Sequence, residues 1–339
     1  MPAAYLSARN LPVSAGGGSV GIGGIVALTY PEAIVVGLVQ GVTELFPVSS
    51  LGHSVLLPAL VGGRWAVDLN VSTPESPYLA FIVGLHVATA IALVIFFRRD
   101  WVRIVRGLLT SVRDRRVSTP DQRLAWLLVL ATIPVGISGL LLEHTFRTTL
   151  GRPTPAAVFL MANGVLLLLG ERLRRSPAPV ERPVAVGATA AGQPAQPPST
   201  VDADADVAAD RRLSRVGVGT ALLVGSAQIL ALLPGISRSG VSMVGGLVRG
   251  LSHEDAARFS FLLATPVIMA AGVLKLPDLA GPLGAGIRGQ VVVGSIVSGL
   301  GAYAAVRWLT RWFTTRTLTP FGIYCLLAGG VGLVVLAVR

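Results

Sequence analysis

Few residues of this chain carry a charge, and only one is a cysteine. Charged residues make up 13% of the 339 positions, hydrophobic residues make up 52%, and the mean hydropathy is +0.70. So small a charged fraction excludes an ordinary soluble globule and predicts a polytopic membrane protein. Because Cys325 is alone, an intramolecular disulfide and a thiolate metal cluster are also excluded. We expect Cys325 only to pack.

Acidic residues are scarcer than basic ones. The 17 acids and 28 basic residues leave a net charge of +11, which comes almost entirely from arginine. These arginines cluster in short segments between apolar runs, which is typical of cytoplasmic loops and not of a nucleic-acid groove. We therefore expect no nucleic-acid partner and place residues 98–123, 171–215 and 307–317 in the cytoplasm.

The apolar runs predict an all-α integral membrane protein. Full-length spans are expected at residues 78–97, 124–142, 156–169, 256–274, 291–306 and 321–338. Two other apolar segments, 25–61 and 216–248, are interrupted by proline and predict re-entrant broken-helix hairpins. The domains are then a flexible N-terminal tail (1–24), a first membrane repeat (25–170), a disordered cytoplasmic Pro/Ala/Asp-rich linker (171–215) and a second membrane repeat (216–339). Segment 143–155 is expected as an outside loop.

An offset of 188 positions relates the two halves. It superposes Gly37 on Gly225, Gln40 on Gln228 and Ser49 on Ser237, with further matches downstream. Counting loop charges, the first hairpin enters from outside and the second from the cytoplasm, so the repeats are inverted. In such proteins, broken helices meet near the midplane at a shared polar site.

The two hairpins hold the few charges that lie deep within apolar sequence. Residues 25–60 contain two acids, Glu32 and Glu44, and residues 216–248 contain one charge, Arg238. A charge at the centre of a membrane costs about 2.5–3.5 kcal/mol on insertion scales, so a chain that keeps one has a use for it. We therefore look for function at these breaks.

Each break predicts a half-helix whose N-terminus faces the membrane interior. The free backbone N–H groups and hydroxyls at such N-termini favour an anion. The planar guanidinium of Arg238 suits phosphate oxygens. We predict a phosphate or diphosphate ligand. The candidate phosphate-binding residues are Ser49, Ser237, Arg238, Ser239 and Ser242.

The acidic motif leaves several chemistries open. Gln40 and Glu44 share a helix face, so Glu44 could hold a divalent cation, Mg²⁺ or Ca²⁺, with Gln40 as a second ligand. Glu44 could instead orient His53 as a base. Ser50 and His53 could form a nucleophile pair, or His53 could be the general acid. The candidate catalytic residues are Glu44, Ser50, His53 and Arg238; the candidate metal ligands are Glu44 and Gln40.

The same residues have structural interpretations. Arg238 and Glu44 could form a buried ion pair across the repeat interface, and His86, in an apolar helix, is typical of a core residue. Ser54 and Ser242 could bond back to helix carbonyls. The glycines of both hairpins are typical of close packing between membrane helices.

Two motifs carry a resemblance to a known family. Gln40-x-x-x-Glu44 with Pro47-Val-Ser-Ser-x-Gly-His53, and Pro234-Gly-x-Ser237-Arg238-Ser239-Gly-x-Ser242, resemble the signatures of undecaprenyl-diphosphate phosphatases of the bacitracin-resistance type. Leu85-His86-Val-Ala-Thr89 and Phe259-Ser-Phe-Leu-Leu-Ala-Thr-Pro266 are also similar to that family. The resemblance covers all but the tail and the linker. It departs at Gln40, where members often have a second carboxylate, and at Leu51, where they have threonine.

The resemblance implies a multi-pass enzyme of the bacterial plasma membrane that removes the terminal phosphate of undecaprenyl diphosphate. It recycles the lipid carrier for peptidoglycan synthesis and confers bacitracin resistance. A divalent cation, membrane lipids and the prenyl substrate are the implied partners, and a homodimer is allowed. The resemblance also implies that Ser50 and His53 are nucleophile and partner and that residues 237–239 grip the diphosphate. We expect the site to face outward, with Ser50 or an activated water attacking.

The main competing hypothesis is a transporter. Inverted repeats with broken helices are typical of secondary carriers, so a lipid-phosphate flippase or anion carrier stays open. A carrier needs Arg238 and the helix dipoles, but it has no evident need for Ser50 beside Glu44. A phosphatase of the phosphatidic-acid type is disfavoured, because no histidine follows Ser239 at the required spacing.

Overall fold

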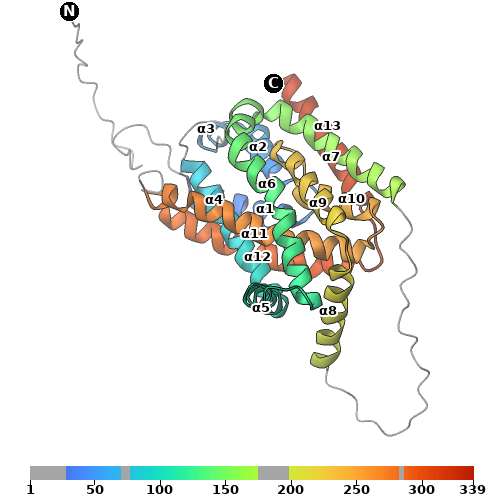
Figure 1. Ribbon diagram of the computed structural model, residues 1–339. Helices are drawn as coiled ribbons and strands as arrows, with labels where there is room; N and C mark the ends of the chain where they lie inside the picture. Colours follow the sequence, from blue (N-terminus) through green and yellow to red (C-terminus); the bar gives the residue numbers. More distant parts are fainter. Residues whose placement is uncertain (1–27, 70–76, 175–197, 282–285) are drawn as a thin grey trace, which may run out of the picture.

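The structure, a computed structural model, describes residues 28–69, 77–174, 198–281 and 286–339 (Figure 1). Within these residues every regular element is a helix, as predicted. The helices are α1 (Tyr30–Leu45), α2 (Ser50–Val61), α3 (Arg64–Asp68), α4 (Pro77–Phe96), α5 (Arg98–Asp114), α6 (Pro120–Leu150), α7 (Pro153–Leu173), α8 (Pro198–Ser214), α9 (Val218–Ala227), the 3-10 helix η1 (Gln228–Leu232), α10 (Arg238–Val248), α11 (His253–Ala280), α12 (Arg288–Trp312) and α13 (Thr319–Val338). The predicted N-terminal tail lies outside the described residues.

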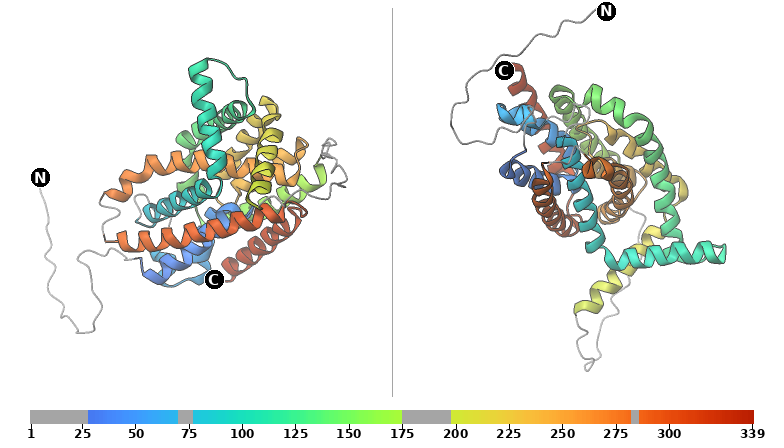
Figure 2. Two further views of the ribbon diagram at one scale, coloured as in Figure 1. Left: turned by 90° about the horizontal axis from the view of Figure 1, so that it is seen from below. Right: turned by 90° about the vertical axis from the view of Figure 1, so that its left-hand side faces the viewer.

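Five helices are long and apolar enough to span a membrane by themselves, namely α6, α7, α11, α12 and α13. Two pairs of consecutive helices are long and apolar enough only when taken together, and each pair is bent at its junction, α4 with α5 by 89° and α8 with α9 by 99°. The described chain therefore has five to seven candidate spans. The arginine-rich segment expected as a loop is therefore largely a helix, α5, and Figure 2 shows it projecting crosswise from the bundle.

The first broken segment folds because its polar residues cap its helices. Thr29 accepts from the backbone N–H of Glu32, and the Glu32 carboxylate accepts from the Thr29 N–H at 2.8 Å, which starts α1 with a capping box. The chain then turns at Pro47, and α2 starts at Ser50 with the Ser49 hydroxyl as cap (Gly52 N to Ser49 Oγ, 3.2 Å). Glu32 is thus a capping residue.

The second broken segment repeats this plan. Helix α9 and η1 end before Pro234, and α10 starts at Arg238 with the Ser237 hydroxyl as cap (Gly240 N to Ser237 Oγ, 3.1 Å). The two capping bonds are offset by 188 residues at both donor and acceptor. The half-helix starts predicted from sequence are therefore where the structure has them.

The two repeats pack with exchanged partners. Helix α1 lies along α12 and α9 lies along α6, and α4 with α11 and α7 with α13 also pair across the two halves. A Cβ on Gly37 would come within 2.5 Å of the Gly294 carbonyl of α12, and one on the equivalent Gly225 within 2.1 Å of the Ala131 carbonyl of α6. Both glycines thus permit a close helix approach at equivalent positions of the two repeats.

The predicted linker is shorter than residues 171–215. Residues 171–173 complete α7, and residues 198–214 form α8, so disorder was the wrong prediction for both ends; residues 175–197 lie outside the described part. Helix α8 is held because Asp210, almost fully buried, receives hydrogen bonds from Arg103 and Arg258, and Asp206 pairs with Arg258 at 2.8 Å. The loop expected at residues 143–155 is also shorter than predicted, since α6 continues to Leu150.

Candidate active site

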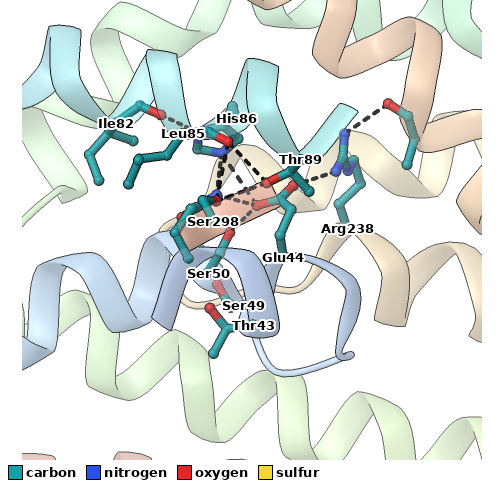
Figure 3. A network of polar contacts seen from close by, with 12 residues as sticks. Thr43, Glu44, Ser49, Ser50, Ile82, Leu85, His86, Thr89, Arg238 and Ser298 are labelled. Carbon is teal, nitrogen blue, oxygen red and sulfur yellow. Dashed lines mark hydrogen bonds and ion pairs between the residues drawn. The ribbon is translucent and has the colours of Figure 1, made fainter. Parts of the chain in front are cut away.

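Glu44 is the centre of a buried polar cluster formed by side chains of α1, α2, α4 and α10 (Figure 3). It comes from the last turn of α1 and is 7% exposed. Its Oε2 accepts from Ser50 Oγ and from Gln40 Nε2 (2.8 Å), and its Oε1 accepts from Arg238 Nη2. A carboxylate so far from water needs such partners, and both of its oxygens have them.

Ser50 reaches Glu44 because of the break after α1. It is the first residue of α2, where the backbone N–H groups of the first turn have no helical acceptor. Ser49, just before it, has a φ of 69°, which is unusual for a residue with a side chain. This turn aims the Ser50 hydroxyl back at the end of α1, and a strained backbone of this kind is typical of functional sites.

Arg238 brings the second repeat to the cluster. It is the first residue of α10, and its guanidinium pairs with Glu44 while Nη1 lies 3.4 Å from the Ala264 carbonyl of α11. The ion pair across the repeat interface, which the sequence offered as a structural alternative, therefore forms. The Arg238 side chain is 16% exposed, so part of its fork of donors stays free for a ligand.

His86 belongs to the cluster, although the sequence favoured a core role for it. Its Nδ1 donates to the Ile82 carbonyl at 2.8 Å, and its Nε2 lies 3.3 Å from Glu44 Oε2 and 3.2 Å from Gln40 Nε2. With a 27% exposed side chain, His86 forms the accessible edge of the cluster beside Arg238. Below it, Thr89 on α4 and Ser298 on α12 join their hydroxyls at 3.2 Å.

His53 does not take the place expected for it. Its Nδ1 donates to the Ser49 carbonyl (2.7 Å), and its Nε2 lies 2.7 Å from the hydroxyl of Tyr324 on α13, with the two rings stacked. Position 53 is one turn beyond Ser50, but α2 turns this side chain away from Glu44. The expected Ser50–His53 pair is therefore absent, and Glu44 itself is the acceptor next to Ser50.

The serines of the second motif bind the two breaks together. Ser237 Oγ and Ser239 Oγ lie 3.0 Å apart, and Ser239 donates to the Phe46 carbonyl at the end of α1 (3.2 Å). Ser242, a turn further along α10, is buried at 2% exposure. Ser54 Oγ has no partner among the described residues, so the expected back-bond to its helix is absent there.

Asn163 on α7 is a positioning residue that the sequence analysis missed. Its Nδ2 donates to the Pro47 carbonyl at 3.0 Å, and its Oδ1 accepts from the Ser237 N–H at 3.0 Å. One fully buried amide thus fixes both breaks. A polar residue in an otherwise apolar span was the only signal that could have identified it.

The described part of the chain does not surround a cation by itself. Among the described residues, no group of three or more His, Cys, Asp or Glu side chains could hold a metal ion. One oxygen does fit such a ligand, because Gln40 Oε1 is buried and has no partner in the part of the chain described. This donor set suits a hard cation that takes most of its oxygens from a bound phosphate.

The cluster has the parts needed for phosphoryl transfer. It joins a hydroxyl, a carboxylate acceptor, a guanidinium and two helix N-termini, all shielded from bulk water. Gln40, Glu44, Ser50 and Arg238 come together as the sequence predicted, Ser49 and Ser237 cap the half-helices, and His53 lies elsewhere.

Comparisons with known proteins give a consistent result. The family model for "Bacitracin resistance protein BacA" matches residues 33–331. An "Undecaprenyl-diphosphatase" of Mycolicibacterium paratuberculosis (strain ATCC BAA-968 / K-10) is 65% identical over 312 residues, which cover 92% of this chain and 99% of that protein. "Undecaprenyl-diphosphatase 1" of Frankia casuarinae is 55% identical, over 90% of this chain and 97% of its own.

Proposed function

The chain belongs to the family of the bacitracin resistance protein BacA, and from this premise we propose how its buried cluster hydrolyses a lipid diphosphate. The protein is an undecaprenyl-diphosphatase of the membrane. It releases phosphate from undecaprenyl diphosphate and returns undecaprenyl phosphate, the lipid carrier used in peptidoglycan synthesis. The observation that carries the mechanism is the hydrogen bond from Ser50 Oγ to the Glu44 carboxylate, beside Arg238.

Arg238 binds the terminal phosphate of the substrate. Its guanidinium pairs with Glu44 in the free enzyme, and the phosphate oxygens offer it a stronger, bidentate partner. When Arg238 turns to the phosphate, Glu44 loses its ion pair with the guanidinium but keeps its hydrogen bond from Ser50, so the carboxylate can accept the Ser50 proton. The N–H groups at the starts of α2 and α10 add donors for the same oxygens.

Ser50 is the proposed nucleophile and Glu44 its base. Glu44 takes the Ser50 proton as Oγ forms a bond to the terminal phosphorus, and the bond from that phosphorus to the bridging oxygen breaks. Undecaprenyl phosphate leaves with the electron pair of the broken bond. Water then attacks the phosphorus of the phosphoserine, the bond to Oγ breaks, Glu44 returns its proton to Oγ, and inorganic phosphate leaves.

A divalent cation completes the proposal. Gln40 Oε1 and Glu44 would hold it from the protein side, and it would neutralise charge on the diphosphate. The site is proposed to open toward the outer face, which the arginine-rich loops on the opposite side support.

The test measures phosphate release from undecaprenyl diphosphate by the purified protein, with and without chelator. Ser50→Ala should lower kcat by at least about a hundredfold, the range seen when a positioned catalytic group is lost. Ser54→Ala is the matched control, because Ser54 is also buried and lies one turn along the same helix, and it should keep near-normal activity.

Labelled substrate separates the two nucleophiles. With the terminal phosphate radiolabelled, acid quenching of the wild type should trap label on the protein, and Ser50→Ala should trap none. If Ser50→Ala keeps its activity while Glu44→Gln loses it, the attacking group is a water and not Ser50. If the intact protein binds the lipid without releasing phosphate under any cation, the carrier hypothesis replaces the chemistry.

A further inference from the structure

Helix α5 has two opposite faces, and only one of them contacts the protein. The buried face is formed by Asp100, Ile104, Gly107 and Ser111. It packs on the start of α6, where a Cβ on Gly107 would meet the Asp121 backbone at 2.9 Å, and Trp126 Nε1 donates to Ser111 Oγ at 2.9 Å. This face accounts for how α5 is held.

The other face is apolar and exposed. Val102, Val105, Leu109 and Val112 are 55%, 47%, 65% and 59% exposed. Their spacing of three, four and three residues places them in one stripe along the helix, opposite the buried face. Four large aliphatic side chains in a continuous stripe need a covering that the described protein does not give them.

Arginines follow one edge of this stripe at a regular interval. Arg99, Arg106 and Arg113 are seven residues apart, so they lie one above another beside the apolar side chains, and all three are exposed. Arg99 and Arg106 form no ion pair with another described residue, and Arg113 contacts only its neighbour Asp114. An aliphatic stripe bordered by cations is typical of a helix lying in a membrane interface.

The direction of α5 agrees with a helix that lies in the membrane interface. It leaves α4, one of the apolar helices, at 89°, and so runs across the direction of that helix (Figure 2). We propose that α5 lies on the cytoplasmic leaflet, with the stripe 102/105/109/112 among the upper acyl chains and Arg99, Arg106 and Arg113 on the headgroups of acidic phospholipids. This surface is separate from the catalytic cluster.

The test uses a spin label as a local probe. Cys325 is fully buried, so one introduced cysteine takes the label alone. Leu109→Cys reports on the stripe, and Asp114→Cys, exposed on the far side of the same helix, is the matched control. The full-length protein is placed in nanodiscs of phosphatidylcholine, or of phosphatidylcholine with phosphatidylglycerol. Collisions with oxygen and with a water-soluble nickel chelate give the depth of the label.

At position 109 the label should favour oxygen over the chelate, and position 114 should show the reverse. Phosphatidylglycerol should raise the ratio of oxygen to chelate collisions at position 109 severalfold, and added salt should reverse this increase. Arg99→Gln with Arg106→Gln should abolish the phosphatidylglycerol effect, whereas the exposed pair Arg307→Gln with Arg311→Gln, which changes the net charge equally, should not.

Three results would overturn the proposal. Equal chelate access at positions 109 and 114 would show that the stripe is not in the membrane. A depth that ignores phosphatidylglycerol and both arginine substitutions would leave an apolar anchor without acidic-lipid recognition. Spin–spin broadening between labels at position 109 on two chains would identify a second copy of the protein as the occupant.

Discussion

At the scale of single residues, Asn163 shows how one side chain can position two motifs that lie far apart in the sequence. Its amide donates to the break after α1 and accepts from the start of α10, which a carboxylate or an apolar side chain cannot do. Ser50, the proposed nucleophile, and Arg238 therefore depend for their positions on a residue that contacts neither side chain.

We predict that Asn163→Asp lowers kcat more than it changes KM. The aspartate could still accept from the Ser237 N–H, but its second oxygen would face the Pro47 carbonyl without a proton, at a cost of about 1–3 kcal/mol. Steady-state kinetics and thermal unfolding would measure both effects. Thr132→Val, which removes a partly buried hydroxyl bonded within α6, is the control and should leave kcat unchanged. An equal loss in both variants would argue against positioning.

A second residue prediction concerns His53. Because its ring bonds to Ser49 and Tyr324, we expect it to hold α2 against α13. His53→Ala and Tyr324→Phe should then lower activity non-additively, with a coupling of about 0.5–3 kcal/mol in a double-mutant cycle on kcat/KM. If the effects are additive and His53→Ala is far the more severe variant, His53 takes part in the reaction and does not only hold α2 against α13.

At this scale the sequence predicts which residues form the site better than it predicts where their side chains point. Glu44, Ser50 and Arg238 were found because charge and hydroxyls are expensive in an apolar segment. His53 was predicted for the site and His86 for the core, whereas the structure has His86 beside Glu44, because the position of each ring depends on the turn at Ser49 and on where α4 packs. Asn163 lay outside every motif.

At the scale of helices, close backbone contacts decide how the two repeats fit. Gly37 and Gly225 were predicted as equivalents from the offset, and each lies against the backbone of a helix from the other half. The pairing of α1 with α12 and of α9 with α6 depends on the absence of a side chain at these two positions.

We predict that Gly37→Ala and Gly225→Ala both destabilise the protein, because each added Cβ would press on a carbonyl oxygen that cannot move alone. Overpacking of this kind costs about 1–3 kcal/mol. Gly330→Ala on α13 is the control: its Cβ would meet nothing within 4 Å, and alanine should be neutral or favourable there. Thermal unfolding in one detergent would rank the three. Stability of both test variants equal to the control would contradict the close approach.

A second helix-scale prediction concerns α8. Asp210, with a 3% exposed side chain, joins α8 to Arg103 and Arg258, whereas Asp206, 40% exposed, contacts Arg258 from the rim. Asp210→Asn should therefore release α8 and speed tryptic cleavage at residues 211–215 severalfold. Asp206→Asn should change that rate little, because a half-exposed ion pair contributes about 0–1 kcal/mol.

Helix bounds were harder to predict than helix types. The spans were found from apolar runs, but α5, α8 and the end of α6 carry many polar or charged residues and were expected as loops or linker. Asp206 falls in the segment predicted as an Asp-rich linker, and its partner Arg258 is distant in sequence. Tertiary ion pairs of this kind do not appear in local composition.

At the scale of the whole molecule, the topology follows from the arginines. If segments 98–123 and 307–317 are cytoplasmic, exposed Thr314 lies inside and exposed Thr145, at the other end of α6, lies outside. Thr145→Cys should react in intact cells with a membrane-impermeant maleimide, and Thr314→Cys only after lysis. Buried Cys325 gives no background. Labelling of Thr314→Cys in intact cells would reverse the topology and turn the site inward.

The first residues of the two half-helices, Ser50 and Arg238, bear on how the two repeats evolved. The offset that superposes the caps also superposes Ser50 on Arg238, so the proposed nucleophile and the phosphate-binding cation occupy one ancestral position. A dimer of identical single repeats would present two serines there or two arginines, never one of each. The present division of labour therefore required a gene duplication, after which the two copies could mutate separately within one chain.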